Sequence, residues 1–277
     1  MCEVSFTLSN ESFEANGNNI KTIYQNIEKL VFLNEKIISF NDSLFRDQNI
    51  YYIPLVNHKL IYEILHVPHT EFSQDHKTML SLIIDRAKDL NGENFQVIGL
   101  NKILGQNIVY TESELMEYYY SLIENKHNEE EFYICINKYF TKLVIHTRVK
   151  ESLKTLEGDG LANFANDIVK SLRYLENNFR NILNESNALP EALIKFSTIL
   201  GIETTLEGKA ARKPDFTFKF QKDNEEDIDI CCEPHIKLSE SSKRGDNSFY
   251  FNRLHFYEGR DGVENGKILI GHIGGHL

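Results

Sequence analysis

Tryptophan is absent from the 277-residue chain, and cysteine and proline are scarce, with four and five residues. Cys2 and Cys135 are isolated, and Cys231 and Cys232 are adjacent with no CxxC spacing, so the sequence predicts neither a disulfide framework nor a cysteine-based zinc site. No segment approaches the roughly 18 consecutive apolar residues of a membrane helix. We therefore expect an ordinary apolar core, no membrane partner and reduced thiols.

Positive charge is also in short supply. The 30 lysines and arginines face 41 aspartates and glutamates, which gives a formal net charge of -11. Nonspecific coating of DNA is not expected, because it needs many cations at the phosphates. From residue 230 onward the charges balance, so histidines can make this tail positive near an anion. The first residues show no basic segment before an apolar one, and we infer a cytoplasmic location without a secretory signal.

Helical periodicity dominates the first two hundred residues. Apolar residues recur every three or four positions in segments 18–33, 73–90, 112–125, 161–183 and 190–200. Strand-like segments are expected at 36–40, 50–56, 131–137 and 143–147. The helix at 161–183 is the longest, and its apolar stripe needs a partner surface, either inside the protein or in a second copy of the chain.

The periodicity changes to two near the C-terminal end. Residues 216–220 alternate between apolar and polar, and so do residues 227–238. The second segment therefore places Glu233, His235 and Lys237 on one face of a strand. Pro234 cannot donate a ladder hydrogen bond, which predicts an interruption of the strand at this point.

A second polar row follows in segment 249–257, where Arg253, His255 and Tyr257 share a face. Segment 267–273 has apolar residues at both odd and even positions, which predicts a strand covered on both faces. The sequence as a whole predicts an α+β fold. Residues 1–204 would form a mainly helical portion with some strands, and residues 205–277 a small antiparallel sheet.

The C-terminal tail collects the residue types that acid–base chemistry on a phosphate requires. Four of the ten histidines lie after Glu233, together with lysine and arginine. Imidazoles transfer protons and a guanidinium binds phosphate oxygens, so their concentration predicts a chemical site. The tail lacks the HExxH and paired CxxC patterns of common zinc sites. The alternative interpretation is an ordinary solvent-exposed strand face, which needs no ligand.

The strand succession of the tail resembles that of RelE/HigB-type ribonuclease toxins. The resemblance covers about the last forty-five residues and rests on Pro234 to Leu238, on 249–257 with Arg253, and on 266–272. It implies cleavage of RNA without a metal or other cofactor, with basic side chains that activate a ribose 2′-hydroxyl and stabilise the phosphorane. The expected catalytic residues are Glu233, His235, Lys237, Arg253, His255 and His272. The expected substrate-binding residues are Tyr257, Lys267 and His276. The tail is also similar to bacterial proteins associated with phage defence that end in HxKL and GHIGxHL segments.

A second nuclease pattern overlaps the first. Lys213-Pro214-Asp215, followed by Glu233 and Lys237, looks like the PD-(D/E)xK pattern of metal-dependent nucleases. That resemblance implies a DNA substrate and a Mg²⁺ ion held by Asp215 and Glu233, with Lys237 assisting the attacking water. The sequence departs from the pattern at His235, where an acidic residue is expected.

A third alternative is that the tail is no enzyme. Its polar rows would then bind a nucleotide, a nucleic acid or a protein partner, since a binding site needs charge complementarity but no general base. The sequence leaves the choice between RNA and DNA open, as it does the metal dependence.

Overall fold

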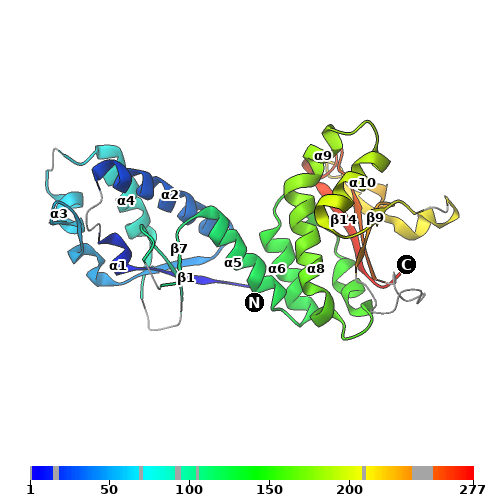
Figure 1. Cartoon of the computed structure of the whole chain (residues 1–277), viewed down its shortest axis with the longest axis horizontal. Coiled ribbons are helices and arrows are strands. Elements are labelled where there is room, and N and C mark those ends of the chain that lie inside the picture. Colours follow the sequence, from blue (N-terminus) through cyan, green and yellow to red (C-terminus); the bar gives the residue numbers. More distant parts are fainter. Residues whose placement is uncertain are drawn as a thin grey trace. The chain divides into compact units, whose positions relative to one another are not determined.

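The computed structural model describes residues 2–14, 19–68, 71–90, 95–103, 106–207, 210–238 and 252–277 (Figure 1). Helices and several sheets are mixed along the chain, in agreement with the expected α+β class. The chain divides into a first unit, residues 3–119, and a second unit, residues 120–277 with residues 1–2. The boundary expected at 204/205 therefore lies inside the second unit. None of the helices in the described ranges has the length and apolar character that a membrane crossing requires.

The first unit is built on a parallel sheet with strand order β5-β2-β1-β6-β7. Its elements are β1 (Ser5–Leu8), α1 (Asn10–Phe13), α2 (Ile20–Ser39), β2 (Ser43–Arg46), η1 (Gln48–Tyr52), β3 (Pro54–Val56), β4 (Lys59–Leu60), α3 (Ile61–His66), α4 (Gln74–Arg86), β5 (Lys88–Asp89), β6 (Gln96–Ile98), β7 (Ile108–Val109) and the start of α5 (Glu112–Glu124). The helices predicted at 18–33 and 112–125 are present as α2 and α5. The one predicted at 73–90 is present as α4 but ends at Arg86, and Lys88–Asp89 form the strand β5 instead. The parallel sheet was not expected, because strands as short as two residues carry no readable period.

The second unit is built on a mixed sheet with strand order β8-β14-β13-β12-β9. Its elements are α6 (Glu129–Tyr139), β8 (Leu143–Ile145), α7 (Val149–Ser152), η2 (Leu153–Thr155), α8 (Leu161–Tyr174), the π-helical η3 (Leu175–Phe179), α9 (Arg180–Asn184), α10 (Leu189–Leu200), β9 (Thr204–Thr205), η4 (Ala210–Phe216), β10 (Thr217–Gln221), β11 (Asp227–Cys231), β12 (His235–Leu238), β13 (Asn252–Tyr257), η6 (Glu264–Gly266) and β14 (Ile268–Gly274). Strands β9, β12, β13 and β14 pair antiparallel, and β8 joins β14 in parallel.

Helices cover one face of this sheet. The Phe179 ring packs edge-on against Phe256 of β13 and Phe196 of α10, with ring centroids 5.1 Å apart in both pairs. Figure 1 shows α8 and α10 lying against the sheet that carries β14. The long apolar stripe predicted at 161–183 thus packs inside this unit, on α8, η3 and α9.

The β10–β11 hairpin covers the other face. A buried cluster joins hairpin and sheet, formed by Phe218, Phe220, Ile230, Cys232, Val263 and Leu269. The register of β14 against β13 shifts by one residue at Gly271, and a Cβ there would lie 2.4 Å from the Phe218 ring. Glycine is therefore required where the hairpin approaches the strand. All seven residues of β14 are buried, which confirms the prediction of a strand covered on both faces.

Three predictions of local structure are wrong in whole or in part. The strand expected at 50–56 covers only Pro54–Val56, because residues 50–52 belong to the 3-10 helix η1. Residues 131–137 are helical, within α6, because Phe132, Cys135, Ile136 and Tyr139 are buried at helical spacing and Asn128 caps the first turn. Residues 36–39, expected as a strand, continue α2, whose buried row extends to Ile37.

The predicted absence of disulfides is also wrong. Cys2 and Cys135 form a disulfide across a sequence separation of 133 residues. Residue 2 lies beside α6, where Lys138 Nζ donates a hydrogen bond of 2.5 Å to the Cys2 carbonyl. Only the tertiary fold brings these two cysteines together, so their spacing in the sequence gave no sign of the pair. Cys231 and Cys232 are free thiols.

Candidate functional site

Three histidines form a row across the second sheet. The register places His235 of β12 opposite His255 of β13, and His255 opposite His272 of β14. Their ring centroids are 5.0 Å apart for the first pair and 5.8 Å for the second. The alternation in the sequence put His235 and His255 on the polar faces of their strands, and strand pairing joins those faces. Each ring is almost completely buried, with at most 2% of the residue exposed.

Each ring in the row donates one hydrogen bond to a backbone carbonyl. His235 Nδ1 donates to Glu233 at 3.3 Å, His255 Nδ1 to Cys232 at 3.1 Å, and His272 Nε2 to Gly275 at 2.8 Å. The second nitrogen of a neutral ring is then an acceptor. His255 Nε2 and His272 Nδ1 are buried and receive no hydrogen bond from any residue that the structure describes.

Burial keeps all three imidazoles uncharged near neutral pH. Burial first, and then the charge of a nearby arginine, lowers the pKa of His235 and of His272 to about 4. The pKa of His255 falls well below its ordinary value, first because of burial and then because of its two histidine neighbours. The Phe216 ring stacks on His255, with centroids 4.7 Å apart. His255 is therefore a core residue with one unused acceptor.

Arg253 belongs to a separate charge cluster. Its guanidinium donates to Glu207 at 2.8 Å, and Arg212 lies 3.5 Å from the same carboxylate. Burial acts to raise the pKa of Glu207, but the hydrogen bond and charge of Arg253 outweigh it and the pKa falls. Arg212 also contacts the His276 ring at 3.2 Å. The expected phosphate-binding Arg253 is thus already paired with a carboxylate.

Other predicted site residues lie in ion pairs or in the core. Lys237 pairs with Glu203, and Glu233 lies 3.2 Å from Lys213. Tyr257 packs against the core cluster beneath the hairpin, and burial raises its pKa. Lys267 is partly exposed and caps η6, immediately before β14.

The three residues of the metal-dependent alternative also have different ion-pair partners. Asp215 lies 3.5 Å from Arg212, whereas Glu233 and Lys237 pair with Lys213 and Glu203. Over the part of the chain that the structure describes, no group of three His, Cys, Asp or Glu side chains is arranged to hold a metal ion.

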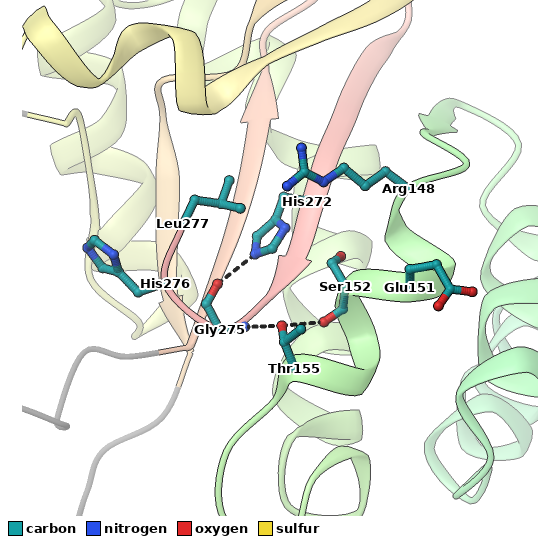
Figure 2. Close-up of a pocket in the computed structure, with 8 residues that line it drawn as sticks. All are labelled: Arg148, Glu151, Ser152, Thr155, His272, Gly275, His276 and Leu277. Carbon is teal, nitrogen blue, oxygen red and sulfur yellow. Dashed lines mark hydrogen bonds between the residues drawn. The ribbon is translucent and has the colours of Figure 1, made fainter.

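A cavity of about 290 Å³ opens at the end of β14. It is lined by Arg148, Glu151, Ser152, Thr155, His272, Gly275, His276 and Leu277 (Figure 2). Of the residues expected from sequence, only His272 and His276 line it. Figure 2 shows the Arg148 guanidinium beside the His272 ring, with His276 on the far side of Leu277.

The two hydroxyls of the cavity are engaged in holding the backbone. Ser152 Oγ donates to the Ile273 carbonyl at 2.8 Å and accepts from the Ile273 amide at 3.3 Å. Thr155 Oγ1 donates to the Ser152 carbonyl at 2.6 Å and accepts from the Gly275 amide at 2.8 Å. A hydroxyl that donates one hydrogen bond and accepts another is poorly placed to act as a nucleophile. Both hydroxyls instead fix the end of β14.

Arg148 is the residue that sequence reasoning missed. It lies in the turn between β8 and α7, is exposed, and forms no ion pair with any residue that the structure describes. Its guanidinium lies 5.5 Å from the Phe218 ring centroid. After burial, its charge is a further cause of the low pKa of His272. No local motif marks this arginine, because it reaches the cavity through the pairing of β8 with β14.

The cavity therefore brings a guanidinium next to an uncharged imidazole. Comparisons of this chain with family models, with curated proteins and with solved structures found no match.

Proposed function

We propose that this protein is a metal-independent ribonuclease that acts at the cavity of His272 and Arg148. The observation that supports it is the pairing of a buried, neutral His272, whose Nδ1 receives no hydrogen bond from the described residues, with a guanidinium that has no carboxylate partner among them. A neutral imidazole accepts protons, and a guanidinium fork matches phosphate oxygens.

In the proposed reaction, His272 Nδ1 takes the proton of a ribose 2′-hydroxyl. The 2′-oxygen attacks the adjacent phosphorus, and Arg148 stabilises the negative charge of the phosphorane. The bond from phosphorus to the 5′-oxygen then breaks, and water protonates the leaving oxygen while His272 returns its proton to water. The products are a 2′,3′-cyclic phosphate and a 5′-hydroxyl end.

Substrate binding has to prepare His272 for this role. Its Nδ1 is screened from solvent, so the 2′-hydroxyl reaches it when the exposed Arg148 side chain moves from the ring onto the phosphate. A pKa of about 4 makes the free imidazole a weak base. The negative phosphate raises the pKa of an imidazole beside it, toward the range in which a general base is effective.

The biological role and the cellular location are part of the same proposal. The HxKL and GHIGxHL segments of the tail support a toxin-like role in phage defence, with RNA as partner in the cytoplasm. The disulfide between Cys2 and Cys135 allows the location to be tested, since cytoplasmic thiols are kept reduced. Both cysteines are buried, so mass spectrometry of protein alkylated while the cells are lysed in denaturant should find both modified if the cytoplasmic location is right.

The decisive experiment offers the purified protein three matched labelled substrates: an RNA, its DNA counterpart, and the RNA with 2′-deoxyribose at the cleaved position. Cleavage of the RNA alone, unaffected by EDTA and with cyclic phosphate ends, is the expected result. Loss of cleavage in EDTA would favour the metal-dependent alternative with Asp215 and Glu233. Equal cleavage of the deoxy substrate would rule out attack by the 2′-hydroxyl, and tight binding without any cleavage would make the protein a binding module.

A further inference from the structure

His146 lies directly behind the arginine of the cavity. It follows β8, and its backbone amide donates to the Ile270 carbonyl of β14 at 2.9 Å. Its ring is half-buried between Phe218 and Phe220 of the hairpin, with centroids 5.6 Å and 5.2 Å away. The residue thus connects three strands at the edge of the cavity without lining it.

Both ring nitrogens of His146 are engaged. The backbone amide of Arg148 donates to Nδ1 at 3.1 Å, so Nδ1 must be the acceptor. Nε2 lies 3.1 Å from the Lys219 carbonyl and must therefore carry the proton. Only the neutral ring satisfies both bonds, because a proton on Nδ1 would face the Arg148 amide.

The hydrogen bond between the Arg148 amide and His146 Nδ1 holds a turn that several further hydrogen bonds depend on. The Arg148 carbonyl accepts the amides of Glu151 and Ser152, at 3.0 Å and 2.9 Å, and so starts α7. Ser152 in turn holds β14 through Ile273. Losing the His146 bond would release the turn that presents the guanidinium to the cavity.

We infer that His146 is a positioning residue which holds Arg148 ready for phosphate only while its own imidazole is neutral, so that acidification weakens anion binding at the cavity. This inference rests on the proposed function, in which Arg148 binds the phosphate. It adds a pH-dependent control of that binding by a residue that touches no substrate.

The surroundings of His146 agree with a ring that is neutral at pH 7 and titrates in acid. Burial is the main cause of its lowered pKa, the bond to the Lys219 carbonyl opposes it, and the Arg148 charge lowers the pKa further. From the hairpin the ring faces two phenylalanines and this carbonyl. Among the residues that the structure describes, Arg148 is the only charged side chain that shifts the pKa of His146. The pKa of His146 therefore lies below the ordinary histidine value of about 6.5.

Two substitutions of His146 test its two hydrogen bonds one at a time. His146→Asn places an amide oxygen near the position of Nδ1, which keeps an acceptor for the Arg148 amide and cannot titrate. His146→Gln places an amide nitrogen near Nε2, which keeps the donor to Lys219 and loses the acceptor. The probe is inorganic sulfate, which stays doubly charged from about pH 8 to about pH 5, with affinity measured by NMR titration and folding checked at each pH.

Wild-type protein should bind sulfate about fivefold more weakly at low pH, the factor expected for one lost hydrogen bond. His146→Asn should show no such decrease, and His146→Gln should bind weakly at every pH. Protonation of His272 or His276 would strengthen sulfate binding in acid, so a decrease cannot come from those rings. The inference is overturned if His146→Asn follows the wild-type pH profile or if His146→Gln binds as wild type does.

Arg148→Gln separates this inference from the proposed function. It should weaken sulfate binding about tenfold at neutral pH, because a charge-assisted contact is lost. If it does so while both His146 variants match wild type, only the role of His146 is wrong. If Arg148→Gln binds sulfate like wild type, the phosphate site is wrong and the role of His146 is overturned with it.

Discussion

Two neighbouring rings of the histidine row differ in what covers them. In the middle of the row, Phe216 stacks on His255, whose second nitrogen lies in the core. At the β14 end, His272 forms part of the wall of a cavity and has Arg148 beside it. All three rings are neutral and bonded to a backbone carbonyl, so neither the charge state nor the presence of that bond distinguishes them. Access to a ligand distinguishes them, because His272 alone of the three lines the cavity. We therefore expect His272 to take part in the chemistry and His235 and His255 to have a structural role.

The largest effect is expected from removing the cation of the cavity. Arg148→Gln should lower the rate of RNA cleavage at least about a hundredfold, because phosphorane stabilisation by a positioned donor is lost. Thermal unfolding should change little, since the side chain is exposed. Cleavage assays and thermal unfolding on the same preparation measure both. Arg260→Gln, which removes an exposed arginine of the same unit outside the cavity, should cleave RNA at the wild-type rate.

The buried, neutral rings should make the folded protein less stable in acid. His235 and His272 have pKa values of about 4 in the fold, against about 6.5 when unfolded, so the unfolded chain binds more protons between these values. The contribution of each neutral ring to the free energy of unfolding is fully present above about pH 6.5. It is lost as the pH drops toward 4, by up to about 3 kcal/mol for each ring. Denaturant titrations at several pH values measure this loss.

His255→Phe is the matched variant for the acid experiment. It keeps a ring against Phe216 and removes one titrating group, so its stability should depend less on pH than that of wild type. RNA cleavage at neutral pH should stay within about threefold of wild type if His255 only supports the core. A loss of cleavage as large as that of Arg148→Gln would place His255 in the chemistry and contradict the comparison.

The smallest effect is expected at Ser152. Ser152→Ala removes the hydroxyl that bonds to Ile273, and should cost about 1 kcal/mol of unfolding free energy. Cleavage should fall only a few-fold, through loosening of β14, because no step of the proposed reaction uses this hydroxyl. A complete loss of activity in a folded Ser152→Ala protein would identify Ser152 as a nucleophile instead.

Alternation in the sequence predicted part of this site. It placed His235 with Lys237 and Arg253 with His255, and the strand register brings the two rows together. Alternation cannot show what lies above a face, so the burial of these rings under Phe216 and the hairpin was not foreseen. His272 was identified by residue type, since its strand does not alternate and a register shift at Gly271 sets its direction.

The remaining features depend on contacts between distant segments. Arg148 reaches the cavity because β8 pairs with β14, which lies more than 120 residues further along the chain. The same holds for Cys2 and Cys135, which meet only in the folded second unit. The parallel sheet of the first unit was missed because its strands are too short to show a period.

The most direct test compares two substitutions of His272 in RNA cleavage with EDTA present. His272→Gln keeps an amide donor for the Gly275 carbonyl and removes the acceptor at Nδ1, whereas His272→Asn keeps an acceptor there and removes the donor. We predict that both folded variants lose cleavage at least about a hundredfold, the range for a general base, because an amide oxygen accepts a hydrogen bond but is too weak a base to take the proton. His127→Gln, at an exposed position, should cleave normally. Cleavage at the wild-type rate by His272→Gln would contradict the central claim that His272 Nδ1 accepts the proton.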